Sequence, residues 1–284
     1  MRRRGASGRI VRNQMRQAMP IDINKIPIFC INLDSRPHRY KKFSMQPGAK
    51  EILPKVQRFP AVDGYKIDIF KSPDISLPTK LNILRKSRRS HGDIDSLGAI
   101  GCSMSHYQIW QKFLAGEAAH CLVLEDDAWI PEGFTGEIAG VVAPDFDVWA
   151  LSYRLYDKRL FPLDSNAPDK KSPWKTPVYY WGTAAYIVSR QGAQKLSEGF
   201  FPIANHLDQY FCMKNTLGYI RLVVHEEVNI PTLSSGTDIQ LHKCDLCDLP
   251  DVFDNEIVLD KRYLYGLVGI GVFLAILLRA TNNG

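Results

Sequence analysis

The chain has 284 residues, a length that suits one large domain or two small ones and argues against a repeat array or a minimal peptide scaffold. Hydrophobic residues make up 45% and charged residues 23%, which is typical of a globular chain and not of a disordered one. The formal net charge is +6, but six arginines precede the first acid, Asp22. The remainder is nearly neutral, so a specific nucleic-acid partner is not expected.

Both ends of the chain differ in composition from the body between them. Residues 1–24 are rich in arginine and contain no apolar run of signal-peptide type, so we expect a basic disordered arm. Residues 263–278 are uncharged and largely apolar, with Lys261 and Arg262 before them and Arg279 after them. Snorkelling cations could extend this segment to the roughly 30 Å of a bilayer core. We expect an apolar C-terminal helix there, acting as a single-pass transmembrane tail anchor behind a linker over 241–262. The body would then be membrane-associated and cytoplasmic; a buried helix is the alternative.

The first half of the body, residues 25–240, alternates between strand-like and helix-like patterns. The apolar run 28–33 predicts a buried strand, and residues 37–45 predict a helix with proline in its first turn. A second strand is expected over 58–64. Residues 66–96 show no clear period and are expected to form a loop.

A helix is expected over residues 100–114, where apolar residues recur at every third or fourth position. Its apolar face would consist of Ile100, Met104, Tyr107, Trp110 and Leu114. Ser105 and His106 would lie opposite much of that face and line a ligand pocket. A structural histidine is the alternative for His106.

The strongest strand signal is the apolar run 121–124, which three acids follow directly. Further strands are expected over 147–153, 178–189 and 219–224, with a loop over 156–177. Ser189 would cap a helix that begins near Gln191, and Asn205 would cap another helix. Alternating strands and helices predict a mainly parallel sheet with helices on both faces, where ligands bind at the carboxyl ends of the strands.

Glu125, Asp126 and Asp127 place three carboxylates at the end of that apolar strand. An uncompensated cluster would be costly there, so a positive partner is expected. Magnesium and manganese prefer oxygen ligands from carboxylates and phosphates, which would suit a metal-bound nucleotide. A solvated turn or a helix cap explains the same three residues equally well.

Six short motifs occur along the chain in a fixed order. They are INLDSRPHR (31–39), AVDG (61–64), GAIGCSMSH (98–106), LEDDA (124–128), GTAAYIVSRQGA (182–193) and LDQ (207–209). Their order and spacing resemble glycosyltransferase family 25, which includes lipopolysaccharide β-galactosyltransferases and collagen hydroxylysine galactosyltransferases. The resemblance covers about residues 26–237. This chain has Ser35 where the first motif usually has Arg, and Ala99 where the glycine-rich motif usually has Glu.

The resemblance implies an α/β fold of the nucleotide-sugar transferase (GT-A) type, with a Rossmann-like mixed sheet flanked by helices. It also implies a UDP-sugar donor and Mn²⁺ or Mg²⁺ held by Glu125 and Asp127, with Asp127 nearest the donor diphosphate. Nucleotide-binding residues are expected after the first two strands and on the helix at 100–114. These residues are Asn32, Asp34, Arg36, Arg39, Asp63, Gly64, Ser105 and His106. A solvated helix face is the alternative for the arginines.

An inverting transfer, which the resemblance implies, needs a base that takes the proton of the acceptor hydroxyl. Asp208 matches the family's second acidic motif and lies where a helix is expected to begin. Asp127 and Asp208 are therefore the predicted catalytic residues. The helix dipole favours an acid in a first turn anyway, so a structural role for Asp208 stays open.

The sequence thus suggests a metal-dependent inverting transferase that moves galactose or glucose from UDP to a glycan or protein hydroxyl at a membrane. One alternative is a metal-dependent phosphodiesterase that uses Glu125, Asp127, Asp208 and His225. Another is a non-catalytic, membrane-anchored adaptor or glycan-binding protein. The sequence HKCDLC (242–247) resembles half a zinc site, without a second pair to complete it.

Overall fold

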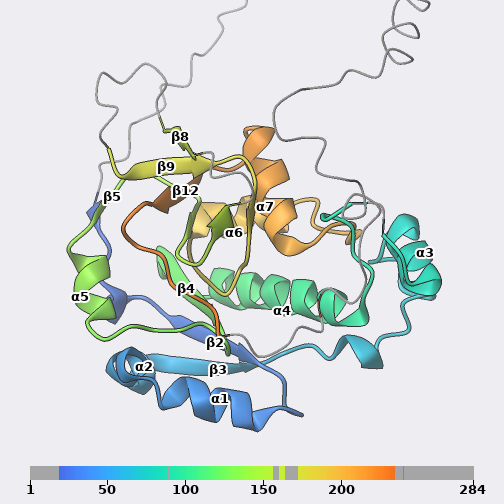
Figure 1. The fold of residues 1–284 in the computed structure, drawn as a ribbon, viewed down its shortest axis with the longest axis horizontal. Coiled ribbons are helices and arrows are strands. Elements are labelled where there is room, and N and C mark those ends of the chain that lie inside the picture. The colour runs from blue at the N-terminus through green and yellow to red at the C-terminus, as the bar shows by residue number, and fades with distance from the viewer. Residues whose placement is uncertain (1–18, 89, 156–159, 164–171, 234–238, 240–284) are drawn as a thin grey trace, which may run out of the picture.

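The computed structural model describes residues 19–88, 90–155, 160–163, 172–233 and 239. An eight-stranded sheet lies at its centre, with helices on both faces (Figure 1). The strands of this sheet are β2 (Ile28–Asn32), β3 (Val56–Pro60), β4 (His120–Glu125), β6 (Val148–Ala150), β8 (Leu160–Pro162), β9 (Trp174–Pro177), β11 (Ala185–Ser189) and β12 (Leu222–His225). Four further described strands form two separate two-stranded sheets. Strand β1 (Met19–Pro20) pairs with β5 (Val142–Ala143), and β7 (Arg154–Leu155) pairs with β10 (Tyr180–Trp181).

The helices are α1 (Pro37–Ser44), α2 (Pro47–Ile52), α3 (Leu77–Arg85), α4 (Leu97–Leu114), α5 (Phe134–Ala139), α6 (Arg190–Ser197) and α7 (Leu207–Thr216). The described residues also form three 3₁₀ turns: η1 (Ile23–Lys25) before β2, and η2 (Leu53–Lys55) and η3 (Gly64–Lys66) between α2 and α3. Pro37 occupies the first turn of α1, as predicted, because its missing N–H has no partner at that position anyway.

The central sheet is mixed, with the strand order β3-β2-β4-β11-β6-β12-β9-β8. Strand β2 runs parallel to β3 and β4, and β6 runs parallel to β12. The other four neighbouring pairs are antiparallel, so the prediction of a mainly parallel sheet is wrong and the mixed α/β sheet flanked by helices is confirmed. The reason is the segment between β6 and β11. Among its described residues, this segment has no helix that would carry the chain back to the other end of the sheet. The chain therefore enters β11 at the end where β6 finished, and β11 runs in the opposite direction.

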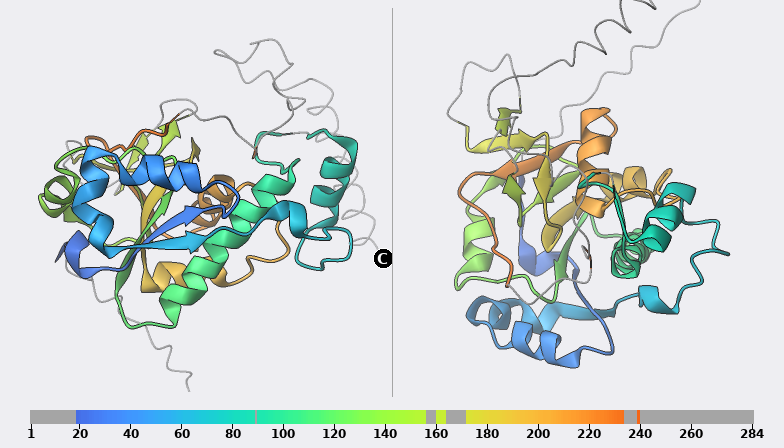
Figure 2. Two further views of the ribbon diagram at one scale, coloured as in Figure 1. Left: turned by 90° about the horizontal axis from the view of Figure 1, so that it is seen from below. Right: turned by 45° about the vertical axis from the view of Figure 1, so that its right-hand side comes forward.

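The side chains of β4 alternate between the two faces of the sheet. Cys121 and Val123 belong to a core that α4, α6 and α7 cover, whereas Leu122 and Leu124 belong to a core that α1, α2 and α5 cover. Helices α1 and α2 lie on one side of β2 and β3, and α4 lies on the other (Figures 1 and 2). By the same alternation, Glu125 continues the α4 face.

Several predicted elements have different bounds in the structure. The expected loop over 66–96 contains α3, which begins after the capping residue Ser76 with proline in its first turn. The expected strand over 178–189 is two strands, because the chain bends at Gly182, whose φ is +106°. The expected loop over 156–177 includes β8 and β9.

Two predicted helix caps have different outcomes. The Ser189 hydroxyl accepts a hydrogen bond from the Gly192 amide at the start of α6, which confirms that prediction. Residue His206, not Asn205, is the N-cap of α7, and its side chain makes no capping bond. The Asn205 side chain instead donates to the Gly92 carbonyl over 3.4 Å.

Helix α4 is buried on more sides than its apolar spacing indicates. Ser105 and His106 are fully buried. The indole N–H of Trp110 donates to the Tyr186 hydroxyl over 2.9 Å, and His106 Nδ1 lies 2.9 Å from the same oxygen. His106 and Trp110 therefore share one face, and the prediction that they lie on opposite sides is wrong. Residues four positions apart on a helix are neighbours, and both are covered by β11.

The predicted ends of the chain lie outside the described residues. These are most of the basic arm (1–18), the linker over 241–262, the apolar segment over 263–279 and the HKCDLC cluster. Within the part of the chain that the structure describes, no helix combines the length and the hydropathy that crossing a bilayer would require.

Candidate functional site

The carboxyl ends of β2, β3 and β4 meet at one edge of the sheet. Ile31 of β2 pairs with Glu125 of β4, and Asn32 pairs with Pro60 of β3. The polar residues of the first motif and the three acids, which are far apart in the sequence, therefore lie side by side. This edge is where parallel strands gather ligand-binding groups.

Asp126 is held on the α1 side of the sheet. The Asn32 side-chain amide donates a 2.6 Å hydrogen bond to its Oδ2, and the Arg39 guanidinium lies 2.6 Å from its Oδ1. Burial raises the pKa of Asp126, although Asn32 and Arg39 oppose the effect. Because both carboxylate oxygens already have partners, Asp126 is a structural link between α1, β2 and β4.

Glu125 lies on the opposite face, against α4. The Thr183 hydroxyl donates to its Oε1 over 2.8 Å, and His106 Nε2 lies 3.4 Å from the same oxygen. Burial alone would raise the pKa of Glu125, but the contacts with His106 and Thr183 outweigh it and hold the pKa below its ordinary value. Glu125 is therefore an ionised carboxylate at neutral pH.

Asp127 has the most perturbed carboxylate of the three. Burial, and then the charge of Glu125, raise its pKa to about 7, although Arg39 lies 3.0 Å from its Oδ2. Its Oδ1 is buried and has no hydrogen-bond partner. A cation beside Asp127 would remove this electrostatic cost.

Asp208 lies in the first turn of α7, where the Gln209 amide donates to its Oδ1 over 2.7 Å. The Gly182 amide donates to its Oδ2 over 3.0 Å. The next residue, Thr183, donates to Glu125, so two consecutive residues bridge the predicted base and the predicted metal ligand. Burial raises the pKa of Asp208, and the neighbouring His206 opposes the effect. Sequence reasoning assigned no role to Gly182 or Thr183, although both lie in the fifth motif.

Other predicted binding residues hold the edge of the sheet in place. The Asp63 side chain caps η3 by accepting from the Tyr65 amide over 3.1 Å. The Ser105 hydroxyl donates to the Gly101 carbonyl over 2.6 Å and accepts from the Val62 amide over 2.8 Å. Ser105 and Asp63 thus hold the turn after β3 against α4. Each of them therefore has a structural role that needs no ligand.

Asp34 and Arg36 lie beyond the end of β2. Asp34 is exposed, and its Oδ1 lies 2.7 Å from the Arg58 guanidinium. Arg58 also donates to the Asn32 side-chain oxygen over 2.9 Å, so a chain of contacts runs from Asp34 to the acids. The Arg36 carbonyl accepts from the Asn32 amide over 3.0 Å. The structure therefore brings the first-motif residues and the acids together at one edge.

The chain matches the family model described as glycosyltransferase family 25 (LPS biosynthesis protein) over residues 25–211. The chain belongs to glycosyltransferase family 25. A glycosyltransferase 25 family member from Aedes aegypti is 35% identical over 176 residues, which cover 60% of this chain and 28% of the relative. The human procollagen galactosyltransferase 2 is 28% identical over 176 residues, covering 60% of this chain and 27% of the relative.

A human relative named inactive glycosyltransferase 25 family member 3 is 27% identical over 195 residues, covering 67% of this chain and 31% of the relative. The family 25 chain thus spans less than a third of the length of these curated relatives. The matched region nevertheless includes every predicted site residue, from Asn32 to Asp208.

In this family 25 chain, His225 lies far from the acids at the end of β4. His225 ends β12, which is separated from β4 by β11 and β6, so the two strands lie about 14 Å apart at the usual strand spacing. Its ring contacts Trp174 edge to face, with 4.9 Å between centroids. The phosphodiesterase grouping of His225 with Glu125, Asp127 and Asp208 is therefore not assembled in the structure.

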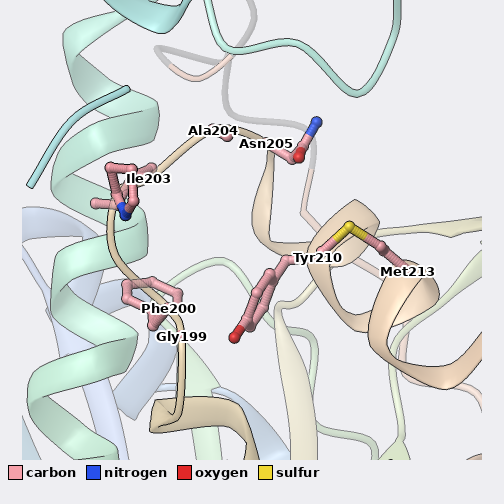
Figure 3. Close-up of a pocket in the computed structure, with 8 residues that line it drawn as sticks. Gly199, Phe200, Ile203, Ala204, Asn205, Tyr210 and Met213 are labelled. Carbon is pink, nitrogen blue, oxygen red and sulfur yellow. The ribbon is translucent and has the colours of Figure 1, made fainter. Parts of the chain in front are cut away.

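A small pocket lies apart from the carboxylates, where the loop after α6 meets α7 (Figure 3). It is lined by Gly199, Phe200, Pro202, Ile203, Ala204, Asn205, Tyr210 and Met213. None of the predicted site residues lines it, and the Tyr210 hydroxyl is already bonded to the Leu196 carbonyl over 2.8 Å. The pocket therefore adds nothing to the candidate site.

Proposed function

We propose that this chain is a metal-dependent inverting glycosyltransferase with a fold of the nucleotide-sugar transferase (GT-A) type. It would move a hexose, galactose or glucose, from a UDP-sugar to a hydroxyl of a glycan or protein acceptor. The observation that carries the proposal is that Gly182 and Thr183 bridge Asp208 to Glu125, the first of the three acids that end β4, in a family 25 chain.

The residues present fit a hard divalent cation. Glu125 and Asp127 offer carboxylate oxygens, and the buried Oδ1 of Asp127 lacks any hydrogen bond. Mn²⁺ or Mg²⁺ bound there would neutralise the charge that develops on UDP as it leaves. Arg39 lies 3.0 Å from Asp127 and would add a second positive charge beside the same phosphates.

The nucleoside would bind after β2. Asn32, Asp34 and Arg36 follow this strand directly, and Asp34 is exposed at the edge of the sheet. An exposed carboxylate can accept hydrogen bonds from ribose hydroxyls, and the amide of Asn32 is already committed to Asp126. Asn32 would therefore act by holding the acids, with Asp34 and Arg36 facing the nucleoside.

Asp208 would act as the base. Its two oxygens are oriented by backbone amides of Gly182 and Gln209, so the carboxylate is fixed before the acceptor binds. It would take the proton of the acceptor hydroxyl as that oxygen attacks the anomeric carbon and the bond from that carbon to UDP breaks. The raised pKa of Asp208 suits this task, because a base with a pKa closer to working pH accepts a proton more readily.

The proposal includes a membrane location. The segment over 263–279 would anchor the body at a cytoplasmic membrane face, where a glycan or protein acceptor would be presented. The anchor lies outside the described residues, so it rests on the sequence alone.

The deciding experiment measures UDP release by the full-length chain in detergent from a panel of UDP-sugars, first with Mn²⁺ and then with chelator. We expect slow hydrolysis of one UDP-sugar, lost with chelator and lost in Asp127→Asn. The matched control Asp68→Asn replaces an exposed acid and should leave the rate unchanged. Folded protein that is silent across the panel, also with candidate acceptors added, would exclude the transferase.

The second candidate is a non-catalytic glycan-binding or adaptor protein. It is favoured by the relative named as inactive and by Ala99, which is 2% exposed in the first turn of α4, where the family usually has Glu. Ser35 is the other departure from the motifs. This candidate predicts binding of a UDP-sugar or glycan, measured by calorimetry, without UDP release.

A further inference from the structure

A second group of metal-ligand side chains lies beside the acids. Cys102 and His106 are one turn apart on α4, and Glu125 ends β4 opposite them. One ligand atom from each of the three side chains lies within 4.8 Å of the others. We propose that Cys102, His106 and Glu125 form a zinc-binding site, which would share Glu125 with the hard-cation site proposed at Glu125 and Asp127.

The donor atoms are already close to the arrangement that zinc needs. Zinc bonds of about 2.3 Å to sulfur and about 2.0 to 2.2 Å to nitrogen and oxygen place tetrahedral ligands about 3.4 to 3.6 Å apart. His106 Nε2 and Glu125 Oε1 are 3.4 Å apart. The Cys102 sulfur lies within 4.8 Å of both of these atoms.

His106 is oriented for metal binding. Its ring is fully buried, and Nε2 has no hydrogen-bond partner. Its Nδ1 lies 2.9 Å from the Tyr186 hydroxyl, which can accept an Nδ1–H bond. Metal-bound histidines usually donate their other ring N–H in this way, which fixes the ring and leaves one nitrogen for the ion.

The composition of the site selects the kind of ion. A thiolate and an imidazole favour zinc over magnesium or manganese, which prefer oxygen. Cys102 and Glu125 are partly exposed, so an ion can enter from solvent. Three protein ligands leave the fourth position of zinc open to water. The thiol of Cys102 loses its proton to solvent as the metal–sulfur bond forms.

The effect of zinc on transferase activity rests on the proposed function. Glu125 would be a ligand in both metal sites, so zinc and the hard cation would compete for one carboxylate. Zinc binding would then inhibit the transferase. Binding of zinc itself does not depend on transferase activity, so it is tested without a donor sugar.

The test uses Co²⁺, which reports thiolate ligation by a charge-transfer band that zinc lacks. The full-length chain would carry His242→Asn, Cys244→Ser and Cys247→Ser, so that the other candidate metal cluster is absent. We expect the cobalt–thiolate band in this background and its loss when Cys102→Ser is added. Cys212→Ser, a buried thiol on α7, is the matched control and should keep the band. A band that persists without Cys102 would overturn the proposal.

A second measurement needs no variant at Cys102. X-ray absorption of the zinc-loaded background protein should show one sulfur at about 2.3 Å with nitrogen or oxygen at about 2.0 to 2.2 Å. A zinc ion without sulfur would overturn the proposal. If the protein releases UDP but shows neither the cobalt–thiolate band nor a zinc–sulfur bond, the zinc site alone is excluded. If it shows both but releases no UDP, the transferase alone is excluded.

Discussion

The side-chain amide of Asn32 donates a 2.6 Å hydrogen bond to Asp126, which lies 94 residues further along the chain. This bond joins the ends of β2 and β4, and Arg39 of α1 holds the other oxygen of the same carboxylate. Both oxygens of the middle acid are thus bound within the protein, whereas the buried Oδ1 of Asp127 has no hydrogen-bond partner. The three consecutive acids have different roles because strand alternation and the turn place them in different surroundings.

Asp126→Asn should lower the free energy of unfolding by about 1 to 3 kcal/mol, because the hydrogen bonds it loses involve a charged acceptor. Asp127→Asn should leave the free energy of unfolding at pH 7 unchanged or raise it, since it removes a desolvated charge. Urea unfolding with chelator present measures both. The reverse order of the two variants would contradict the assigned roles.

The stability of the metal-free protein should depend on pH through Asp127. Its pKa in the folded chain is about 7, against about 3.9 for an unfolded chain, so the folded state binds the extra proton between these values. The contribution of Asp127 to stability therefore falls as pH rises from about 4 to about 7, by at most about 1.4 kcal/mol per pH unit.

The comparison of wild type with Asp127→Asn isolates this contribution. The free energy of unfolding of the variant minus that of wild type, measured in urea with chelator, should increase from pH 4 to pH 7. A difference that is constant over this range would show that Asp127 titrates near its ordinary value. Saturating Mn²⁺ should abolish the dependence, because a bound cation favours the ionised carboxylate.

Asp208→Asn should lower the rate of transfer to an acceptor by about 100- to 10,000-fold, the usual contribution of a general base. The wild-type rate should fall as pH drops through the raised pKa of Asp208, because the protonated carboxyl cannot accept a proton. Glu137→Gln is the control, since Glu137 is an exposed first-turn acid of α5. Equal rates for Asp208→Asn and the control would assign Asp208 a purely structural role.

Gly64→Ala should destabilise the fold by about 2 to 3 kcal/mol, as overpacking does in a rigid contact. A Cβ on Gly64 would lie 1.8 Å from the Leu97 carbonyl oxygen at the start of α4. Gly136→Ala is the control, because a Cβ there meets no atom within 4 Å and alanine favours the helix by up to about 1 kcal/mol. Thermal unfolding compares them, and equal melting temperatures would contradict the close approach of Gly64 to α4.

Elements whose residues carry a strong local signal could be predicted from the amino-acid sequence. The apolar run that ends at three acids, the proline at the start of α1 and the Ser189 cap all have the predicted structure. The proline and the cap act within one helical turn, and an unbroken apolar run marks a buried strand whichever strands it pairs with. Helix α3 was missed because it has nine residues, a proline in its first turn and Thr79 as its one buried residue, so it carries no clear apolar period. The order of the six motifs also predicted the family.

Which side chains meet across distant segments depends on how the chain folds in three dimensions. Strand direction depends on where the chain re-enters the sheet, which local pattern does not specify, so the antiparallel β11 was not predicted. That reversal places Gly182 and Thr183 between Asp208 and Glu125. The grouping of Cys102 with His106 and Glu125 likewise depends on how α4 packs against β4. Residue types reveal what chemistry is available, but distances between distant segments are set by packing, and these distances determine which side chains act together.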